Sequence, residues 1–228
     1  MPVDNDRYLS LIARAAADFS FYKGTIQDLS RNQRPMTFVG SPSFGTIGGL
    51  PCLKQNAAAD GTTSAVVPAV VDLAGSWSAE AILIPGPGTT LNIITQLGAG
   101  NAGGFQIQWR NTGGDVNLLA VYQYDIAGVV RLFYTNIGAF VRYTPGHLLF
   151  SSINNGASAK FWINGIPAVA NAFGAGVPAN IGANRSIVVG TGAAIASFLF
   201  VRLLPFAFTN EDATACYQQA HILTSGEV

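Results

Sequence analysis

Charged side chains are scarce in this chain of 228 residues. Asp, Glu, Lys and Arg make up 11% of it, against about 25% in a typical soluble domain. Twelve basic residues balance twelve acidic ones, so the formal net charge is zero. A balanced charge gives no electrostatic case for binding nucleic acid or an anionic membrane. We therefore expect neither partner.

Long apolar segments are also missing. The most apolar run, Ile195 to Phe208, contains Arg202 and Pro205 and is shorter than the ~20 residues that a membrane-spanning helix needs. The first 24 residues begin with acidic side chains and contain no apolar stretch, so they predict no signal peptide. Few charges favour the hypothesis of a surface that other protein subunits cover, and isolated secreted domains with low charge are the alternative.

The residue types that carry catalysis are few. The only glutamates are Glu80, Glu211 and Glu227, and no strand offers a second carboxylate beside one of them. Glycoside hydrolysis needs two facing carboxyl groups, roughly 5–5.5 Å apart for retention and wider for inversion. The only histidines are His147 and His221, and no Gly-x-Ser-x-Gly nucleophile elbow is present. The sequence predicts that the protein is not an enzyme.

Only two cysteines are present, Cys52 and Cys216. Without an export signal, two buried thiols are favoured over a disulfide, although the sequence alone leaves both open. Two cysteines by themselves do not complete a zinc site.

Turn residues and short apolar runs, in contrast, are abundant, with 26 glycines and 11 prolines. Residues 5–18 predict a helix, because Tyr8, Leu11, Ile12 and Ala15 recur at helical spacing. Strands are expected at 36–40, 64–71, 76–85, 91–98, 104–111, 116–125, 129–136, 147–154, 159–164, 186–191 and 197–206.

Turn chemistry separates these runs. In KFWINGIPA, residues 160–168, Asn164-Gly165 is the pair that best tolerates the positive φ angles of a type I′ hairpin turn. About eleven short strands at hairpin spacing predict an all-β, antiparallel sandwich or barrel, and two sheets packed face to face suit the apolar strands best.

Four stretches, taken in order, resemble a known family. They are DLSRNQRPMTFVGSPSFGTIGGLPCLKQN (28–56), SWSAEAILIPG (76–86), YTPGHLLFSSINNGASAKFWINGIPA (143–168) and LPFAFTNEDATACYQQAH (204–221). Together they resemble the laminin-G-like branch of the concanavalin A-like lectin/glucanase jelly rolls. The chain departs from that pattern where His147-Leu148-Leu149 replaces a Trp-His pair, and where Leu203 or Leu204 replaces an arginine.

The resemblance implies a jelly-roll domain over residues 23–228 with a short C-terminal helix. Residues 1–22 lie outside it and are expected to form a helical extension. Because the Tyr8, Leu11, Ile12 and Ala15 stripe needs a partner, we expect this helix to dock or oligomerise.

The resemblance also raises calcium as the one candidate cofactor, because laminin-G-like domains often hold Ca²⁺ with Asp and Asn oxygens. Asp28, Asn32 and Asp60 are the residues in matching turns. For Asp28 and Asn32 the favoured alternative is that the side chains bind their own backbone in Asx-turns.

A glycan site requires an exposed aromatic ring with amide or charged partners for hydroxyl groups. Trp109, Tyr122 and Tyr124 lie on neighbouring expected strands and alternate with polar residues. Those polar residues include Gln106, Gln108 and Arg110. The alternative is that the aromatic rings point inward. Trp109 shares its strand face with Phe105 and Ile107, which favours the core for that residue.

These observations lead to two functional hypotheses. The first is a non-catalytic structural or adhesion protein, most plausibly a phage virion component such as a capsid decoration, head-fibre or tail protein. Such a protein would assemble in the host cytoplasm with other subunits, as a homo-oligomer. The alternative is a carbohydrate-binding module that recognises a surface glycan.

Overall fold

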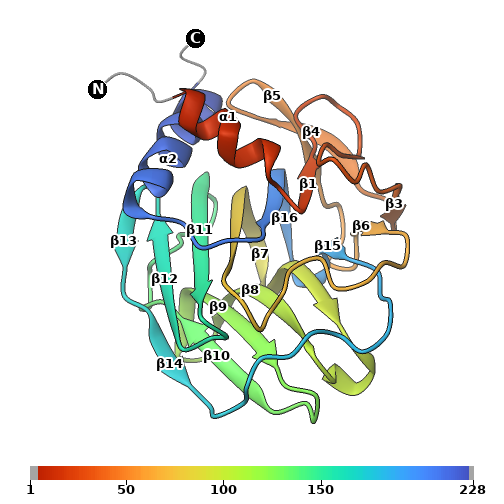
Figure 1. Cartoon of the computed structure of the whole chain (residues 1–228). Coiled ribbons are helices and arrows are strands. Elements are labelled where there is room, and N and C mark those ends of the chain that lie inside the picture. The colour runs from red at the N-terminus through yellow and green to blue at the C-terminus, as the bar shows by residue number, and fades with distance from the viewer. Residues whose placement is uncertain (1–4, 226–228) are drawn as a thin grey trace.

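The computed structural model describes residues 5–225 as an antiparallel β-sandwich with a helix near each end (Figure 1). The helices are α1 (Asn5–Ala13), the 3-10 helix η1 (Ala99–Asn101) and α2 (Asn210–Ser225). The strands are β1 (Ala17–Ser20), β2 (Gln27–Asp28), β3 (Met36–Val39), β4 (Ser43–Ile47), β5 (Leu50–Lys54), β6 (Gly61–Ser64), β7 (Trp77–Leu97), β8 (Gly104–Thr112), β9 (Asp115–Tyr124), β10 (Val130–Tyr134), β11 (Gly146–Ile153), β12 (Ser158–Ile163), β13 (Ile166–Ala168), β14 (Asn171–Phe173), β15 (Val188–Gly190) and β16 (Gly192–Leu204).

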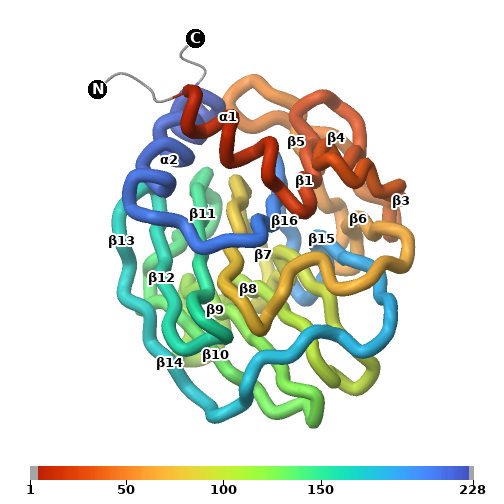
Figure 2. The backbone as a smooth tube through the Cα atoms, in the orientation of Figure 1, coloured from red at the N-terminus to blue at the C-terminus, as the bar shows by residue number. Residues whose placement is uncertain are grey.

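Strand β7 belongs to both layers of the sandwich. Its first half pairs with β11 and β16, and its second half pairs with β8 and β15. We call β13-β12-β11-β7-β16-β1-β2 the covered layer, and β14-β10-β9-β8-β7-β15-β6-β3 the open layer. The two layers can be followed along the backbone in Figure 2.

Aromatic side chains fill the space between the layers. The ring of Trp77 lies 4.8 Å from that of Phe105 and 5.3 Å from that of Phe150, measured between centroids. Phe150 also contacts Phe133 of β10 and Phe161 of β12. These contacts join strands of both layers, so alternate residues of each strand form one continuous core.

Both helices pack on the covered layer. Tyr8 and Leu11 of α1 share an apolar cluster with Leu149 of β11 and Trp162 of β12. Helix α2 contacts α1 and β11, and Figure 1 shows the two helices side by side at one end of the molecule. Neither α1 nor α2 packs on the outer face of the open layer.

Local sequence signals explain the turn and the cap that frame these elements. Asn164 and Gly165 have φ angles of 51° and 76°, which confirms the type I′ turn between β12 and β13. At the start of α2, Thr209 Oγ1 accepts a hydrogen bond from the backbone N–H of Asp212, whose carboxylate accepts one from the N–H of Thr209. This reciprocal pair is a capping box.

Several of the expected elements are wrong in extent. The strands expected at 76–85 and 91–98 form one strand, β7, and the strand expected at 197–206 begins at Gly192. Residues 64–71 do not form a strand beyond Ser64, because Pro68 lacks a backbone donor and Val67 makes only an isolated bridge to Arg185. The helix expected over 5–18 ends at Ala13, because residues 17–20 pair with β16 as strand β1. Strands β1, β2, β4, β5 and β14 were not expected, whereas β13 is the return strand of the predicted hairpin.

Cys52 and Cys216 are both buried free thiols, as favoured from the sequence. Among residues 5–225, none of the helices has the length and apolar character needed to cross a bilayer.

Candidate functional site

The outer face of the open layer brings together most of the residues expected to bind a glycan. Along β8 the side chains of Gln106, Gln108 and Arg110 alternate with buried Phe105, Ile107 and Trp109. On β9, Tyr122 and Tyr124 are half-buried and alternate with fully buried Val121 and Gln123. Since alternate residues point to opposite faces, these five side chains point outward together.

Cross-strand pairing sets their order. Gln106 pairs with Tyr122, which pairs with Leu132 of β10, which in turn pairs with Phe173 of β14. One row beside it, Gln108 lies level with Tyr134 across β9. Paired residues on one face have side chains in contact range, so the rows form a continuous surface of amides, tyrosines and apolar groups.

Hydrogen bonds hold the polar groups of this surface in place. The rings of Tyr122 and Tyr124 are stacked, with centroids 6.4 Å apart and planes 16° apart. Arg110 Nη1 donates to the hydroxyl of Tyr122 at 2.9 Å. Burial, and then the neighbouring Tyr122, raise the pKa of Tyr124, so its hydroxyl keeps its proton at neutral pH.

The two glutamines turn to a shared acceptor. Gln106 Nε2 and Gln108 Nε2 each donate to Asn92 Oδ1 of β7 at 2.9 Å. Within residues 5–225 the Oε1 atoms of both glutamines accept no hydrogen bond. Their positions are therefore fixed, while an acceptor on each remains available to a hydroxyl group.

Two adjoining depressions hollow the far side of this face. One, of about 240 Å³, is lined by Arg110, Asp115, Leu118, Ala120, Leu132, Tyr134 and Phe173. The other, of about 460 Å³, shares Asp115, Leu118 and Tyr134 and continues past Ile137. Phe173 on the edge strand β14 is 66% exposed, so its ring stands at the rim. We call this surface, from Asn92 to Phe173, the open-face site.

Trp109 is not part of the site. It is fully buried, and its Nε1 donates to the carbonyl oxygen of Phe140 at 2.9 Å. The expectation of a glycan-stacking role for this residue is therefore wrong, and its shared face with Phe105 and Ile107 had indicated the core. Five further residues of the site were not predicted from the sequence, namely Asn92, Asp115, Leu132, Tyr134 and Phe173. The alternation within expected strands could have found Asn92, Leu132 and Tyr134, whereas Asp115 and Phe173 lie outside those strands.

The expected docking stripe on α1 is covered by the chain itself. Tyr8 and Leu11 are buried in the cluster with α2, Ala15 is fully buried, and Ile12 packs against the same cluster. This stripe already has its partner inside the chain, so it does not form an exposed docking surface. Leu9, on the other side of α1, is 59% exposed.

Asp28, expected as a calcium ligand, uses its oxygens within the chain. Oδ1 accepts from the backbone N–H groups of Asp18 and Ser30, and Oδ2 pairs with Arg34 Nη1 at 2.8 Å. Burial alone would raise the pKa of Asp28, but these bonds outweigh it and lower that pKa. Asn32 Nδ2 donates to the carbonyl of Ala16 instead of turning its amide toward Asp28.

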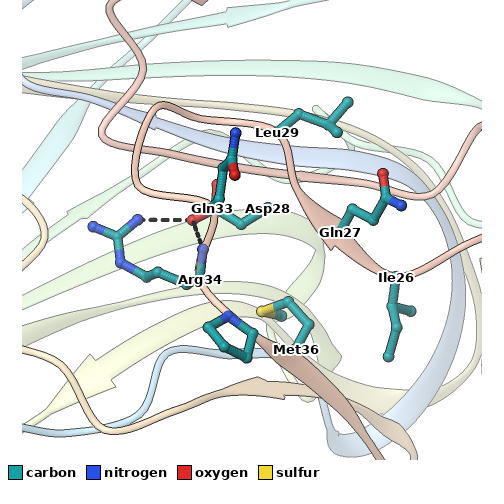
Figure 3. A pocket seen from close by; sticks show the side chains of 8 residues that line it. Ile26, Gln27, Asp28, Leu29, Gln33, Arg34 and Met36 are labelled. Carbon is teal, nitrogen blue, oxygen red and sulfur yellow. Dashed lines mark hydrogen bonds and ion pairs between the residues drawn. The ribbon is translucent and has the colours of Figure 1, made fainter.

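Figure 3 shows the cavity beside this ion pair, about 530 Å³ in volume and lined by residues 26–29 and 33–36. Asp28 and Arg34 meet at one side of it, with Met36 and Ile26 nearby. All of its lining comes from one loop and its flanking strands β2 and β3. The charges of the Asp28 carboxylate and the Arg34 guanidinium, which meet at this cavity, neutralise each other.

Asp60 lies in a separate loop, and its carboxylate oxygens also bind groups within the chain. Its carboxylate accepts from the backbone N–H groups of Ser41, Asn56 and Ala57, which lower its pKa. These backbone bonds already use both oxygens of the Asp60 carboxylate. Within residues 5–225, no group of three or more His, Cys, Asp or Glu side chains is arranged to hold a metal ion.

A buried charged row runs beneath the helices on the covered layer. Arg202 of β16 lies between Asp18 of β1 and Glu80 of β7, with nitrogen–oxygen distances of 3.0 and 3.1 Å. Arg202 Nη1 also donates to Tyr8 Oη at 2.6 Å, and His147 Nε2 lies 3.0 Å from the other oxygen of Glu80. Asp18, the carboxylate on the other side of Arg202, is far from Glu80 along the chain, so the sequence alone does not place the two carboxylates near each other.

This row has the character of a structural network. Asp18, Glu80 and Arg202 are each 2% exposed, and Arg202 binds both carboxylates. Burial would raise the pKa of Glu80, but the charge of Arg202 and the hydrogen bond of His147 outweigh it and lower that pKa. An ionised carboxylate that is already paired is not a general acid.

We expect the protein to lose stability in acid because of these carboxylates. The folded-state pKa values of Glu80 and Asp28 lie below their unfolded values of about 4. The two ionised carboxylates contribute fully to the free energy of unfolding at pH values above their unfolded pKa. This contribution is lost as the pH falls through their folded-state pKa values. Urea unfolding from pH ~7 to ~3 measures the loss, and Glu80→Gln should reduce its steepness. A midpoint that stays constant over this range would contradict the assignment.

Comparisons with known proteins identify the fold. No protein-family model and no curated protein sequence matches the chain. Among solved structures, the botulinum neurotoxin serotype D ligand-binding domain in complex with N-acetylneuraminic acid is similar over 93% of this chain and 52% of that one, with 12% identity and a TM-score of 0.72. The binding domain of botulinum neurotoxin serotype G matches 90% of this chain and 51% of its own, with 12% identity and a TM-score of 0.70.

A third similar structure is the binding domain of Paraclostridial Mosquitocidal Protein 1, with 10% identity and a TM-score of 0.71 over 92% of this chain and 53% of that one. The chain therefore spans about half the length of the structures that it matches. At these identities the likeness shows the fold alone, an antiparallel lectin-like β-sandwich. It does not single out the laminin-G-like branch.

Proposed function

We propose that this chain is a non-catalytic binding domain that recognises a glycan through the open-face site. The observation that carries the proposal is the pair of stacked tyrosines, Tyr122 and Tyr124, set among fixed amides on a sheet face that neither helix covers. The C–H face of a sugar ring packs on aromatic rings, while hydroxyl groups bind amides and arginine.

The similar solved structures support binding over catalysis. All three are binding domains, and one of them, a ligand-binding domain, was solved with N-acetylneuraminic acid. Because this chain matches about half of that domain, the place of the sugar there is not carried over to this chain. The buried pairing of Glu80 with Arg202 also favours a domain without acid–base chemistry.

Removing aromatic surface from the site should weaken glycan binding. Tyr124→Ala and Phe173→Ala each delete a ring that a sugar would contact, and we expect at least ~10-fold weaker binding for either variant. A glycan array with wild-type protein first identifies a ligand, and titration calorimetry then compares the variants.

Phe38→Ala is the matched control, because Phe38 of β3 is also an exposed aromatic residue but lies outside the open-face site. We expect wild-type affinity for this variant. Equal losses in all three variants, or an array on which no glycan is bound, would contradict the proposal.

A second candidate function is that of a subunit in a larger assembly, such as a phage virion attachment or decoration protein. It is favoured by Phe38 and Phe44, whose exposed rings contact each other with centroids 6.2 Å apart on β3 and β4. An exposed apolar pair on a chain with few charges suits contact with another subunit. Light scattering after size-exclusion chromatography tests it, since a stable monomer that does not bind a particle would contradict this role.

A further inference from the structure

The charges of the open-face site cancel each other. Arg110 Nη2 lies 2.9 Å from Asp115 Oδ2, while Nη1 of the same guanidinium donates to Tyr122. Among the residues that line the two depressions, these are the only charged side chains. The single cation of the site is thus already held by a carboxylate at its rim.

The ion pair between Arg110 and Asp115 disfavours the binding of an acidic sugar. Its carboxylate could reach Arg110 only by displacing Asp115, or by lying beside it with two like charges in contact range. Either arrangement costs interaction energy, because the existing ion pair is lost or a repulsion is added. A neutral sugar leaves the pair intact and can accept hydrogen bonds at its edges.

The floor of the smaller depression is apolar. Leu118 and Ala120 of β9 lie beside Leu132 of β10, and Phe173 stands at the rim. Such a floor suits the C–H face of a pyranose ring or a methyl group on it, and gives no compensation to a buried charge.

We propose that the open-face site selects uncharged saccharides over acidic ones, and that Asp115 sets this selection by neutralising Arg110. The inference rests on the proposed glycan function and names the ligand class for the same site. It separates this chain from the similar domain that was solved with N-acetylneuraminic acid, an acidic sugar.

A glycan array with matched neutral and acidic oligosaccharides tests the proposal. We expect the wild-type protein to bind neutral members at least ~10-fold more tightly than acidic ones. Affinity for the neutral ligand should change little with salt, because no net charge is neutralised on binding. Preferred binding of acidic glycans, or strongly salt-sensitive affinity, would overturn this inference and leave the proposed function standing. Binding of no saccharide would overturn both.

Asp115→Asn isolates the role of the carboxylate. The variant leaves Arg110 without its ion-pair partner, so we expect the preference for neutral over acidic ligands to fall by about tenfold. Asp6→Asn is the control, because it removes the same charge from an exposed position on α1, at the covered layer. An unchanged preference in a folded Asp115→Asn protein, verified by its thermal melt, would overturn the role of Asp115.

Discussion

Replacing Arg202 by methionine is expected to lower the free energy of unfolding by about 3–5 kcal/mol, because the change leaves buried carboxylates without their partner. Arg202 binds Asp18 and Glu80 at the same time, and all three are almost fully buried. Tyr8 of α1 would also lose its hydrogen bond. Urea unfolding followed by tryptophan fluorescence measures the effect.

Arg31→Met is the control for the loss of an arginine, since Arg31 is exposed and should change stability by less than about 0.5 kcal/mol. Adding Glu80→Gln to Arg202→Met removes one of the stranded charges and should recover part of the loss. If Arg202→Met unfolds at the wild-type urea concentration, the buried row contributes nothing to stability and our description of it is wrong.

The second large effect is expected for Phe150→Ala, which should cost about 3–5 kcal/mol by leaving a cavity between the layers. Phe150 is fully buried and contacts the rings of Trp77, Phe133 and Phe161. No single neighbour can fill the space, since the three rings come from different strands and both layers.

Phe173→Ala gives the comparison, because that ring is mostly exposed on β14 and its loss should cost less than about 1 kcal/mol. The same pair of variants separates stability from binding, since Phe173→Ala is expected to weaken glycan binding while the fold persists. Similar stability losses for the two phenylalanines would contradict the placement of Phe150 at the centre of the core.

Features that depend on neighbouring residues could be predicted from the sequence. Asn164-Gly165 specified its turn, and the alternation in β8 placed Gln106 and Gln108 opposite Trp109. The same alternation showed that Trp109 could not share a face with the glutamines, which is why the core alternative for it was correct.

Features that depend on distant pairing could not be predicted. Residues 17–20 follow a helix and carry alanine, yet they form β1 because β16 offers them a partner almost two hundred residues later. Arg202 stood out in the sequence only as an interruption of an apolar run, and its carboxylates come from two other strands. For the same reason Phe173, on a three-residue edge strand, gave no signal as part of a site.

The two sheets share strand β7, and this sharing affects how the protein unfolds. The 21 residues of β7 provide hydrogen-bond partners for β11 and β16 at one end, and for β8 and β15 at the other. Neither sheet can melt alone without exposing half of this shared strand and the aromatic rings behind it. The sandwich should therefore denature in a single cooperative step, although the pairing network within residues 5–225 contains sixteen strands.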